Sequence, residues 1–177
     1  MNTVEIIILV LFTAASLWFN WWVSVRERRF HGIYRFVSFE SIFLLVLLNY
    51  PVWFEHPFSA LQIISWLLLI MSLTVAAWGF AVFYTRGKPE DQMEKTTALI
   101  TTSIYRYIRH PLYLSLILAG FGAMAKDPGL LQVILALVNF AAMFFTARVE
   151  EKEMKARFGQ AYSDYMKKTR MFFPFVL

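Results

Sequence analysis

Apolar residues are gathered in blocks of about 20, the length at which an α-helix crosses the hydrocarbon core of a bilayer. Hydrophobic residues make up 59% of the 177-residue chain, whereas soluble domains are nearer half apolar. We therefore predict an all-α integral membrane protein with one domain, residues 1–177, and five transmembrane helices. The predicted spans cover residues of about 4–25, 36–54, 58–84, 111–125 and 130–146.

The last 30 residues differ in character from these blocks. Val149, Phe158, Tyr162 and Tyr165 can share one helical face, while charged residues fill the others. This pattern predicts an amphipathic interfacial helix within the tail 147–177, interrupted near Gly159. Glu150 and Glu151 would then begin that helix, where carboxylates are favoured.

The cationic residues indicate an orientation. Of the 17 Lys and Arg residues, 16 fall after the first block, between the third and fourth blocks, or in the tail, and only Lys126 falls elsewhere. The positive-inside rule places these segments and the C-terminus in the cytoplasm and the N-terminus outside. The net charge of +5 is explained by this topology, so we predict no nucleic-acid partner. The sequence does not indicate an oligomeric state.

Several kinds of site are excluded or disfavoured. The chain has no Cys, which excludes disulfides and thiolate chemistry, and its three His residues lack metal-ligand spacing. No Gly-rich fingerprint follows a strand-like run, so a Rossmann-type cofactor site is excluded. Any cofactor must therefore bind within the membrane bundle, and we predict no metal.

Glu40 lies about one turn inside the second block, where a carboxylate must pair, reach the interface or become neutral. An interfacial Glu paired with Arg35 or another basic residue is the preferred interpretation. A site residue that faces the bundle is the alternative.

Polar chemistry is densest between Thr97 and Tyr113, in the sequence TALITTSIYRYIRHPLY, and again after Arg148. His110 and Tyr113 are three residues apart and would share a face at the start of the fourth helix. Together with the Glu150–Glu151 pair, they could hold a cationic ligand that has a carboxylate end. The alternative is a set of interfacial anchors, with Arg109 on headgroups and Tyr113 in an aromatic belt.

The residues also resemble a known family. Tyr105-x-x-x-Arg109-His110-Pro111-x-Tyr113 is followed, after one hairpin, by Glu150-Glu151, Phe158-Gly159-x-x-Tyr162-x-x-Tyr165 and Pro174. This order is similar to that of the isoprenylcysteine carboxyl methyltransferases, which are related to membrane phospholipid methyltransferases. The resemblance covers roughly the C-terminal half of the chain, residues 97–174.

This resemblance implies a helical membrane methyltransferase that uses S-adenosylmethionine and has a lateral opening for a lipophilic small-molecule or lipid substrate. The acceptor would be a carboxyl group, an amine or a thiol. The residues implied in cofactor binding are Thr97, Ala98, Leu99, Ile100, Tyr105, His110, Pro111, Leu112, Tyr113 and Glu150.

Two departures from the family pattern concern the site. The eukaryotic members of the family carry an Arg four residues before the first Glu, where it handles the substrate carboxylate. This chain has Thr146 at that position, and the nearest Arg is Arg148. We assign Arg148 the catalytic, substrate-handling role as a hypothesis, although two residues are about half a helical turn. Ser103 occupies a position that is usually Gly.

Two alternatives remain open. Sterol reductases resemble the same fold in their C-terminal parts, so an NADPH-dependent membrane reductase could use Arg106, Arg109 and Arg148 to hold phosphates. The acidic pair suits a cation better. A non-enzymatic membrane protein or transporter should carry ionisable residues deep within its spans, and only Glu40 comes close.

Overall fold

The computed structural model describes residues 3–23, 31–87 and 98–174. These residues form helices and no β-strand, and the only β-type contact among them is an isolated bridge between Ile108 and Arg170. The elements are α1 (Thr3–Val23), α2 (His31–Asn49), the 3₁₀ turn η2 (Tyr50–Val52), α3 (Ala60–Arg86), the 3₁₀ turn η3 (Ser103–Arg106), α4 (Pro111–Met124), α5 (Leu130–Phe158) and α6 (Gln160–Lys168).

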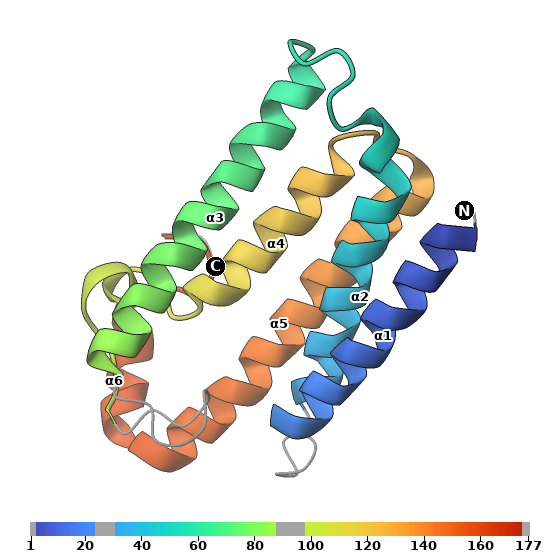
Figure 1. The fold of residues 1–177 in the computed structure, drawn as a ribbon. Coiled ribbons are helices and arrows are strands. Elements are labelled where there is room, and N and C mark those ends of the chain that lie inside the picture. Colours follow the sequence, from blue (N-terminus) through green and yellow to red (C-terminus); the bar gives the residue numbers. More distant parts are fainter. Residues whose placement is uncertain (1–2, 24–30, 88–97, 175–177) are drawn as a thin grey trace.

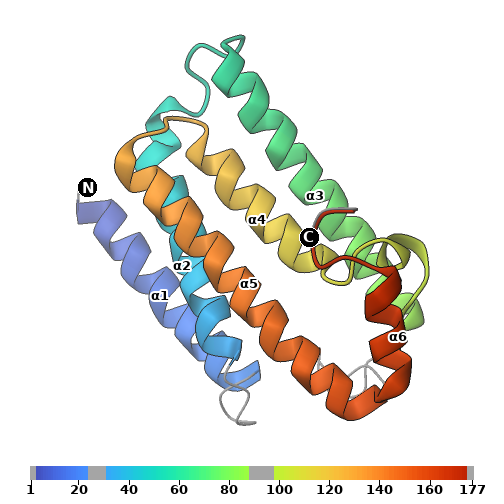
Figure 2. The same ribbon diagram turned by 180° about the vertical axis from the view of Figure 1, so that it is seen from behind.

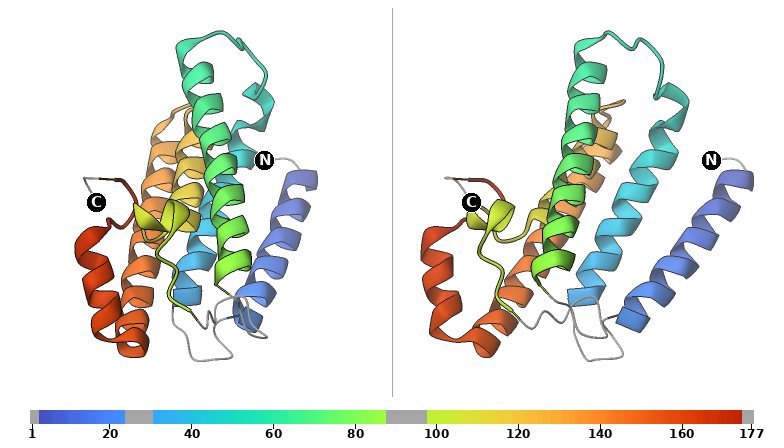
Figure 3. Two further views of the ribbon diagram at one scale, coloured as in Figure 1. Left: turned by 90° about the vertical axis from the view of Figure 1, so that its left-hand side faces the viewer. Right: turned by 60° about the vertical axis from the view of Figure 1, so that its left-hand side comes forward.

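The helices form an elongated bundle with α4 at its centre (Figures 1 and 2). α4 packs against α2, α3 and α5, and α1 packs on the outer side of α2. α1, α3 and α5 end at one end of the bundle, which we call the site end because residues 98–110 and α6 also lie there (Figure 3). The all-α membrane fold is therefore confirmed.

Among the residues that the structure describes, four helices are long and apolar enough to cross a membrane: α1, α2 with η2, α3 and α5. α4 has only 14 residues, or about 21 Å of helix, which is less than a hydrocarbon core of about 30 Å. It begins at Pro111, because Pro suits the first turn of a helix and the preceding backbone is not helical. The shortness of α4 leaves space at the site end, and residues 98–110 occupy it (Figure 1).

Two predicted boundaries are wrong. α2 begins at His31 rather than near residue 36, so Glu40 lies about two and a half turns inside the helix. α5 continues without a break from Leu130 to Phe158, so Glu150 and Glu151 lie late in a long helix and do not begin a new one. The argument from a helix N-terminus therefore does not apply to them. The predicted interruption at Gly159 is confirmed, since α6 begins at Gln160.

Polar side chains join the apolar helices at a few buried points. Ser38 Oγ donates to Asn139 Oδ1 at 2.6 Å, and Asn139 Nδ2 donates to the Leu116 carbonyl at 3.0 Å. Asn49 Nδ2 donates to the Ala123 carbonyl at 2.8 Å. Because an unpaired amide costs free energy in an apolar core, these bonds define how α2, α4 and α5 pack on one another.

Small residues allow α4 to approach its neighbours closely. A Cβ atom added at Gly122 would lie 2.9 Å from Leu69 Cγ of α3, which is closer than real contacts allow. Ser65 Oγ donates to the Gly122 carbonyl at 2.7 Å across the same contact. The α3–α4 pair therefore forms one wall of the molecule against which the site is built.

Candidate active site

The site begins with the segment that leads into α4. Thr97 lies outside the described residues, and Ala98, Leu99 and Ile100 run along the site end before η3. Ser103 has a φ of +59°, a left-handed conformation that favours glycine. Its hydroxyl accepts a hydrogen bond from Trp78 Nε1 at 2.8 Å. This geometry explains why Gly is usual here in the similar family, and the bond to α3 anchors the Ser that replaces it.

A buried ionic cluster joins this segment to α5. Arg109 Nε donates to Glu151 Oε1 at 2.7 Å. His110 Nδ1 lies 3.3 Å from Glu150 Oε2, and His110 Nε2 lies 3.4 Å from Glu151 Oε1. Glu151 is almost completely buried, whereas the Glu150 side chain is 32% exposed. The sequence predicted the proximity of His110 and Glu150, and the cluster adds the Arg109–Glu151 pair.

The charge state of His110 follows from these neighbours. Burial by itself lowers the pKa of His110, but the adjacent carboxylates of Glu150 and then Glu151 outweigh it, so the pKa is raised. The imidazole ring stacks on Tyr113, with centroids 5.3 Å apart and planes 9° from parallel. His110 Nε2 is buried without an aligned hydrogen-bond partner among the described residues, so it retains the capacity to donate to a ligand.

The C-terminal segment holds the motif in place, and the sequence did not predict this. The amides of Arg109 and His110 donate to the carbonyls of Arg170 and Met171 at 2.8 and 3.1 Å. Arg109 Nη1 also donates to the Thr169 carbonyl at 2.7 Å. Phe172 is completely buried and packs against His110. The one available signal was the apolar run after Arg170, which is short and has no periodicity.

α6 closes the site from the same side. Tyr165 OH donates to the Tyr105 carbonyl at 2.6 Å. Burial raises the pKa of Tyr105, Tyr162 and Tyr165, and the charge of Glu150 adds to this shift for Tyr105 and Tyr162, so all three phenols stay neutral. The turn into α6 needs Gly159, whose φ of +56° and ψ of −126° are unfavourable for any residue with a side chain.

These elements enclose a cavity of about 530 Å³, which we call the site cavity. All the predicted cofactor-binding residues that the structure describes line it, namely Ala98, Leu99, Ile100, Tyr105, His110, Pro111, Leu112, Tyr113 and Glu150. Further lining residues that the sequence did not predict come from the N-terminal helices and from α5, among them Arg35, Phe39, Phe80, Glu153 and Met154. A volume of this size suits a small-molecule ligand.

Arg148 is not brought to this cavity. Its side chain is exposed and is not among the lining residues, while Thr146, two residues earlier, is completely buried. Thr146 Oγ1 donates to the Ala142 carbonyl of its own helix. The half-turn between the two positions therefore directs Arg148 away from the buried side of the helix that carries Thr146. This placement gives no support to a catalytic role for Arg148.

Glu40 also lies away from the site cavity. Its Oε2 accepts a hydrogen bond from Thr13 Oγ1 of α1 at 2.8 Å, and Arg35 instead donates from Nε to Asn20 Oδ1. Neither predicted role, an interfacial pair with Arg35 or a site residue, describes this contact. Glu40 joins α1 to α2.

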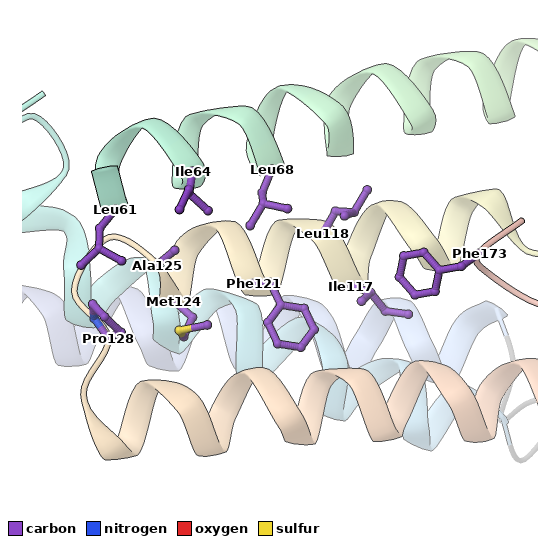
Figure 4. Close-up of a pocket in the computed structure, with 10 residues that line it drawn as sticks. All are labelled: Leu61, Ile64, Leu68, Ile117, Leu118, Phe121, Met124, Ala125, Pro128 and Phe173. Atoms are coloured by element: carbon purple, nitrogen blue, oxygen red, sulfur yellow. The ribbon is translucent and has the colours of Figure 1, made fainter. Parts of the chain in front are cut away.

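A second, apolar cavity of about 430 Å³ is lined by residues of α3, α4 and the turn that follows α4 (Figure 4). Its walls carry no charged side chain among the described residues. Phe173 from the C-terminal segment closes one end, and Pro128 lies at the other. This cavity lacks groups that could orient a reacting ligand.

Comparison with known proteins identifies a family and several related sequences. Residues 60–161 match the phospholipid methyltransferase family. Methanethiol S-methyltransferase 2 of Bradyrhizobium diazoefficiens is 35% identical over 74 residues, which are 42% of this chain and 28% of that protein. Methanethiol S-methyltransferase of Crocosphaera subtropica is 23% identical over 175 residues, covering 88% of this chain and 66% of the relative.

A third relative is the nickel-cobalt-cadmium resistance protein NccN of Alcaligenes xylosoxydans xylosoxydans. It is 32% identical over 154 residues, which are 85% of this chain and 67% of that protein. The chain thus spans between about a quarter and two thirds of the length of these relatives. The matched region contains α3, α4, α5 and the start of α6, and with them most of the walls of the site cavity. The chain belongs to the phospholipid methyltransferase family of multi-pass membrane proteins.

Proposed function

We propose that the chain is an S-adenosylmethionine-dependent membrane methyltransferase that acts on a lipophilic or small hydrophobic acceptor. The observation that carries this proposal is the site cavity, in which a buried His–Glu cluster meets aromatic rings and apolar walls. The family match supports methyl transfer as the reaction. Two of the relatives are named for a thiol acceptor, and the family is named for phospholipids, so the acceptor class is a separate question.

The residues present fit the cofactor. A sulfonium and an α-ammonium are cations, which suits the carboxylate of Glu150 and the ring faces of Tyr105 and Tyr113. The α-carboxylate needs a donor, and His110 Nε2 is a buried donor without an aligned partner among the described residues. We assign the amino-acid end of the cofactor to His110 and Glu150, and its surroundings to Ala98, Leu99, Ile100, Pro111, Leu112 and the two tyrosines. Thr97, outside the described residues, is assigned to the same group from the resemblance.

When bound, the cofactor supplies an electrophilic methyl group attached to sulfur. The chain's own contribution is to align the acceptor with that group and to exclude water. An acceptor that arrives as a thiol or an ammonium must lose a proton, and Glu150, the more exposed carboxylate of the pair, can accept it. By the positive-inside rule, the site end and its cavity mouth face the cytoplasm, where the cofactor is found.

Calorimetric titration with S-adenosylhomocysteine, with NADPH in parallel, tests the proposal on the detergent-purified chain. We expect S-adenosylhomocysteine to bind and NADPH not to bind. Glu150→Gln should weaken binding about tenfold or more, because it removes a charged hydrogen-bond acceptor from the site. Glu55→Gln is the matched control, since Glu55 is exposed in the turn at the opposite end of the bundle.

Two results would contradict the proposal. Binding of NADPH alone would assign the same residues to a reductase. If folded protein bound neither ligand, the cluster would be a structural anchor of the C-terminal segment and not a cofactor site.

A further inference from the structure

The outer face of α5 changes abruptly from apolar to basic, and the proposed function does not account for the basic part. Six exposed side chains share this face, because they are separated by three, four or seven residues in a helix that turns by about 100° per residue. None of them lines the site cavity. We call this row the α5 ladder, and its members are Ile134, Val138, Phe145, Arg148, Lys152 and Lys155.

Contacts between helices relate this change to an aromatic belt. Trp21 and Trp22, in the last turn of α1, are both about half exposed, as aromatic residues are at a membrane–water interface. Asn20 of the same turn accepts a hydrogen bond at 2.9 Å from the start of α2, which places the two helix ends at one level. Tyr34, also at the start of α2, packs on Phe145 with ring centroids 5.6 Å apart. The belt therefore crosses α5 at about Phe145, and the cations of the ladder begin one turn beyond it, toward the site end.

The length of α5 agrees with this level. Residues 130–147 carry no charged side chain and form about 27 Å of helix, close to the thickness of a hydrocarbon core of about 30 Å. From Arg148 to Lys155 the helix rises about 10 Å more, which carries the cations through the headgroup layer. The α5 ladder thus has an apolar half at the depth of lipid chains and a cationic half at the depth of lipid headgroups.

The three cations of the ladder are not neutralised within the part of the chain that the structure describes. No carboxylate there forms an ion pair with Arg148, Lys152 or Lys155. The carboxylates of the same turns, Glu150 and Glu151, face the buried ionic cluster instead. Like charges that lie three and four residues apart on a helix repel one another. An anion that lies along the ladder would relieve this repulsion.

We propose that the α5 ladder binds an anionic phospholipid of the bilayer, at a site separate from the site cavity. The acyl chains pack on Ile134, Val138 and Phe145, and the phosphate lies against Arg148 and Lys152. An arginine can bind a phosphate through two parallel hydrogen bonds, while a lysine acts as a point charge. Each cation near an anionic lipid surface strengthens binding about fivefold. Such a lipid binds whether or not the site cavity accepts S-adenosylmethionine, so this inference is independent of the proposed function.

The test compares two lipids that share their acyl chains and differ in headgroup charge. Binding of dioctanoyl phosphatidylglycerol, which is anionic, and of dioctanoyl phosphatidylcholine, which is zwitterionic, is measured by microscale thermophoresis on the full chain in nonionic detergent. We expect the anionic lipid to bind about tenfold or more tighter, and the preference to shrink in about 0.5 M salt. Glycerol 3-phosphate, the headgroup without chains, should bind much more weakly than the anionic lipid. Equal binding of the two would identify a site for free phosphate and overturn the proposal.

Variants link this preference to the ladder. The ladder variant R148Q/K152Q/K155Q should remove it. K152Q alone should reduce it about fivefold, which tests the proposal if the ladder variant does not fold. A matched control removes the same charge from three exposed positions of the site end that lie off the ladder, namely R106Q/R157Q/K168Q.

The control variant should keep the anionic preference. Met154→Trp, which fills the site cavity, should keep it as well, because the lipid lies outside that cavity. The proposal is overturned if the unaltered chain shows no anionic preference, if the folded ladder variant retains it, or if the control variant loses it to the same extent. Loss of the preference in folded Met154→Trp would place the lipid in the site cavity and overturn the proposal too. Thermal unfolding in the same detergent establishes which variants are folded.

Discussion

The two cavities beside α4 are similar in volume and opposite in chemistry. The site cavity of about 530 Å³ contains His110, Glu150, Arg109 and Arg35 in its walls, whereas the walls of the apolar cavity of about 430 Å³ are uncharged. Both are lined by α3 and α4, and α5 contributes lining residues to the site cavity. The difference teaches that helix packing alone can form a cavity. The polar and charged side chains of the site come instead from additional elements, namely the segment before α4, the end of α5 and α6.

A polar site inside a membrane bundle must also be held together, which the apolar cavity does not require. At the site end, Arg109, His110 and the C-terminal backbone are tied to Glu151 and to one another. The apolar cavity needs only side-chain packing, with Phe173 at one end. Stability and function should therefore be coupled at the first cavity and separate at the second.

The largest effect is expected from Glu151→Ala. This change leaves the buried Arg109 without its carboxylate, and breaking a buried pair costs roughly 3–5 kcal/mol. Thermal unfolding in detergent should show a strong loss of stability together with loss of S-adenosylhomocysteine binding. The stability of Glu151→Gln, which keeps a hydrogen-bond acceptor, should lie between that of the unaltered chain and that of Glu151→Ala. Unchanged unfolding of Glu151→Ala would show that the cluster does not hold the site together.

Gly159→Ala should have the next largest effect. No atom would crowd the new methyl group, so the effect isolates the unfavourable backbone conformation, which costs on the order of 1–3 kcal/mol. Since α6 carries Tyr162 and Tyr165 to the site cavity, binding of S-adenosylhomocysteine should weaken as well. Ala161→Gly, which exchanges the same two residue types at an exposed position of α6, is the control and should not affect the turn at Gly159. An unaltered unfolding temperature in Gly159→Ala would mean that the turn tolerates a side chain.

The pH dependence of stability should reveal His110. Its pKa is raised in the folded chain, so its contribution is fully present below its unfolded pKa of about 6.5 and is lost as pH rises through the folded value. The difference in unfolding temperature between the unaltered chain and His110→Gln should thus be largest at about pH 6 and shrink at higher pH. If the difference in unfolding temperature grew with pH, the pKa of His110 would be lowered in the folded chain, which would contradict the cluster geometry.

The smallest effect is expected at Ser103. Ser103→Gly relieves a left-handed conformation but loses the bond from Trp78, so the two effects should nearly cancel, to within about 1 kcal/mol. Ser103→Val, which keeps the strain and loses the bond, should be clearly less stable. Equal stability of the Gly and Val variants would argue against strain at this position.

Sequence patterns predicted the parts of this molecule that depend on local periodicity or on motif order. The apolar blocks predicted the membrane fold, and the Arg109–Tyr113 and Glu150–Glu151 motifs predicted residues that now line one cavity or pack beside it. The tertiary contacts were not predictable in the same way. The position of Arg35 depends on how α1 and α2 pack. The contact between residues 169–173 and the Arg109–His110 motif depends on backbone hydrogen bonds, which carry no sequence signature.

Helix ends explain the remaining differences. α5 continues past Thr146 because no Gly or Pro interrupts it before Gly159, although its composition changes from apolar to charged. Hydropathy therefore marked where the composition changes and not where the helix ends. The exposed position of Arg148 follows from the same continuity, since helical phase carries it half a turn away from the buried Thr146.

The central claim is that the site cavity, and not the apolar cavity, binds the methyl donor. The most direct measurement is calorimetric titration of S-adenosylhomocysteine into two variants that each fill one cavity with an indole ring. Met154→Trp fills the site cavity between Glu150 and Phe158, and Ile64→Trp fills the apolar cavity. The account predicts that Met154→Trp loses binding while Ile64→Trp binds as the unaltered chain does. Retained binding in folded Met154→Trp, with loss in folded Ile64→Trp, would contradict it.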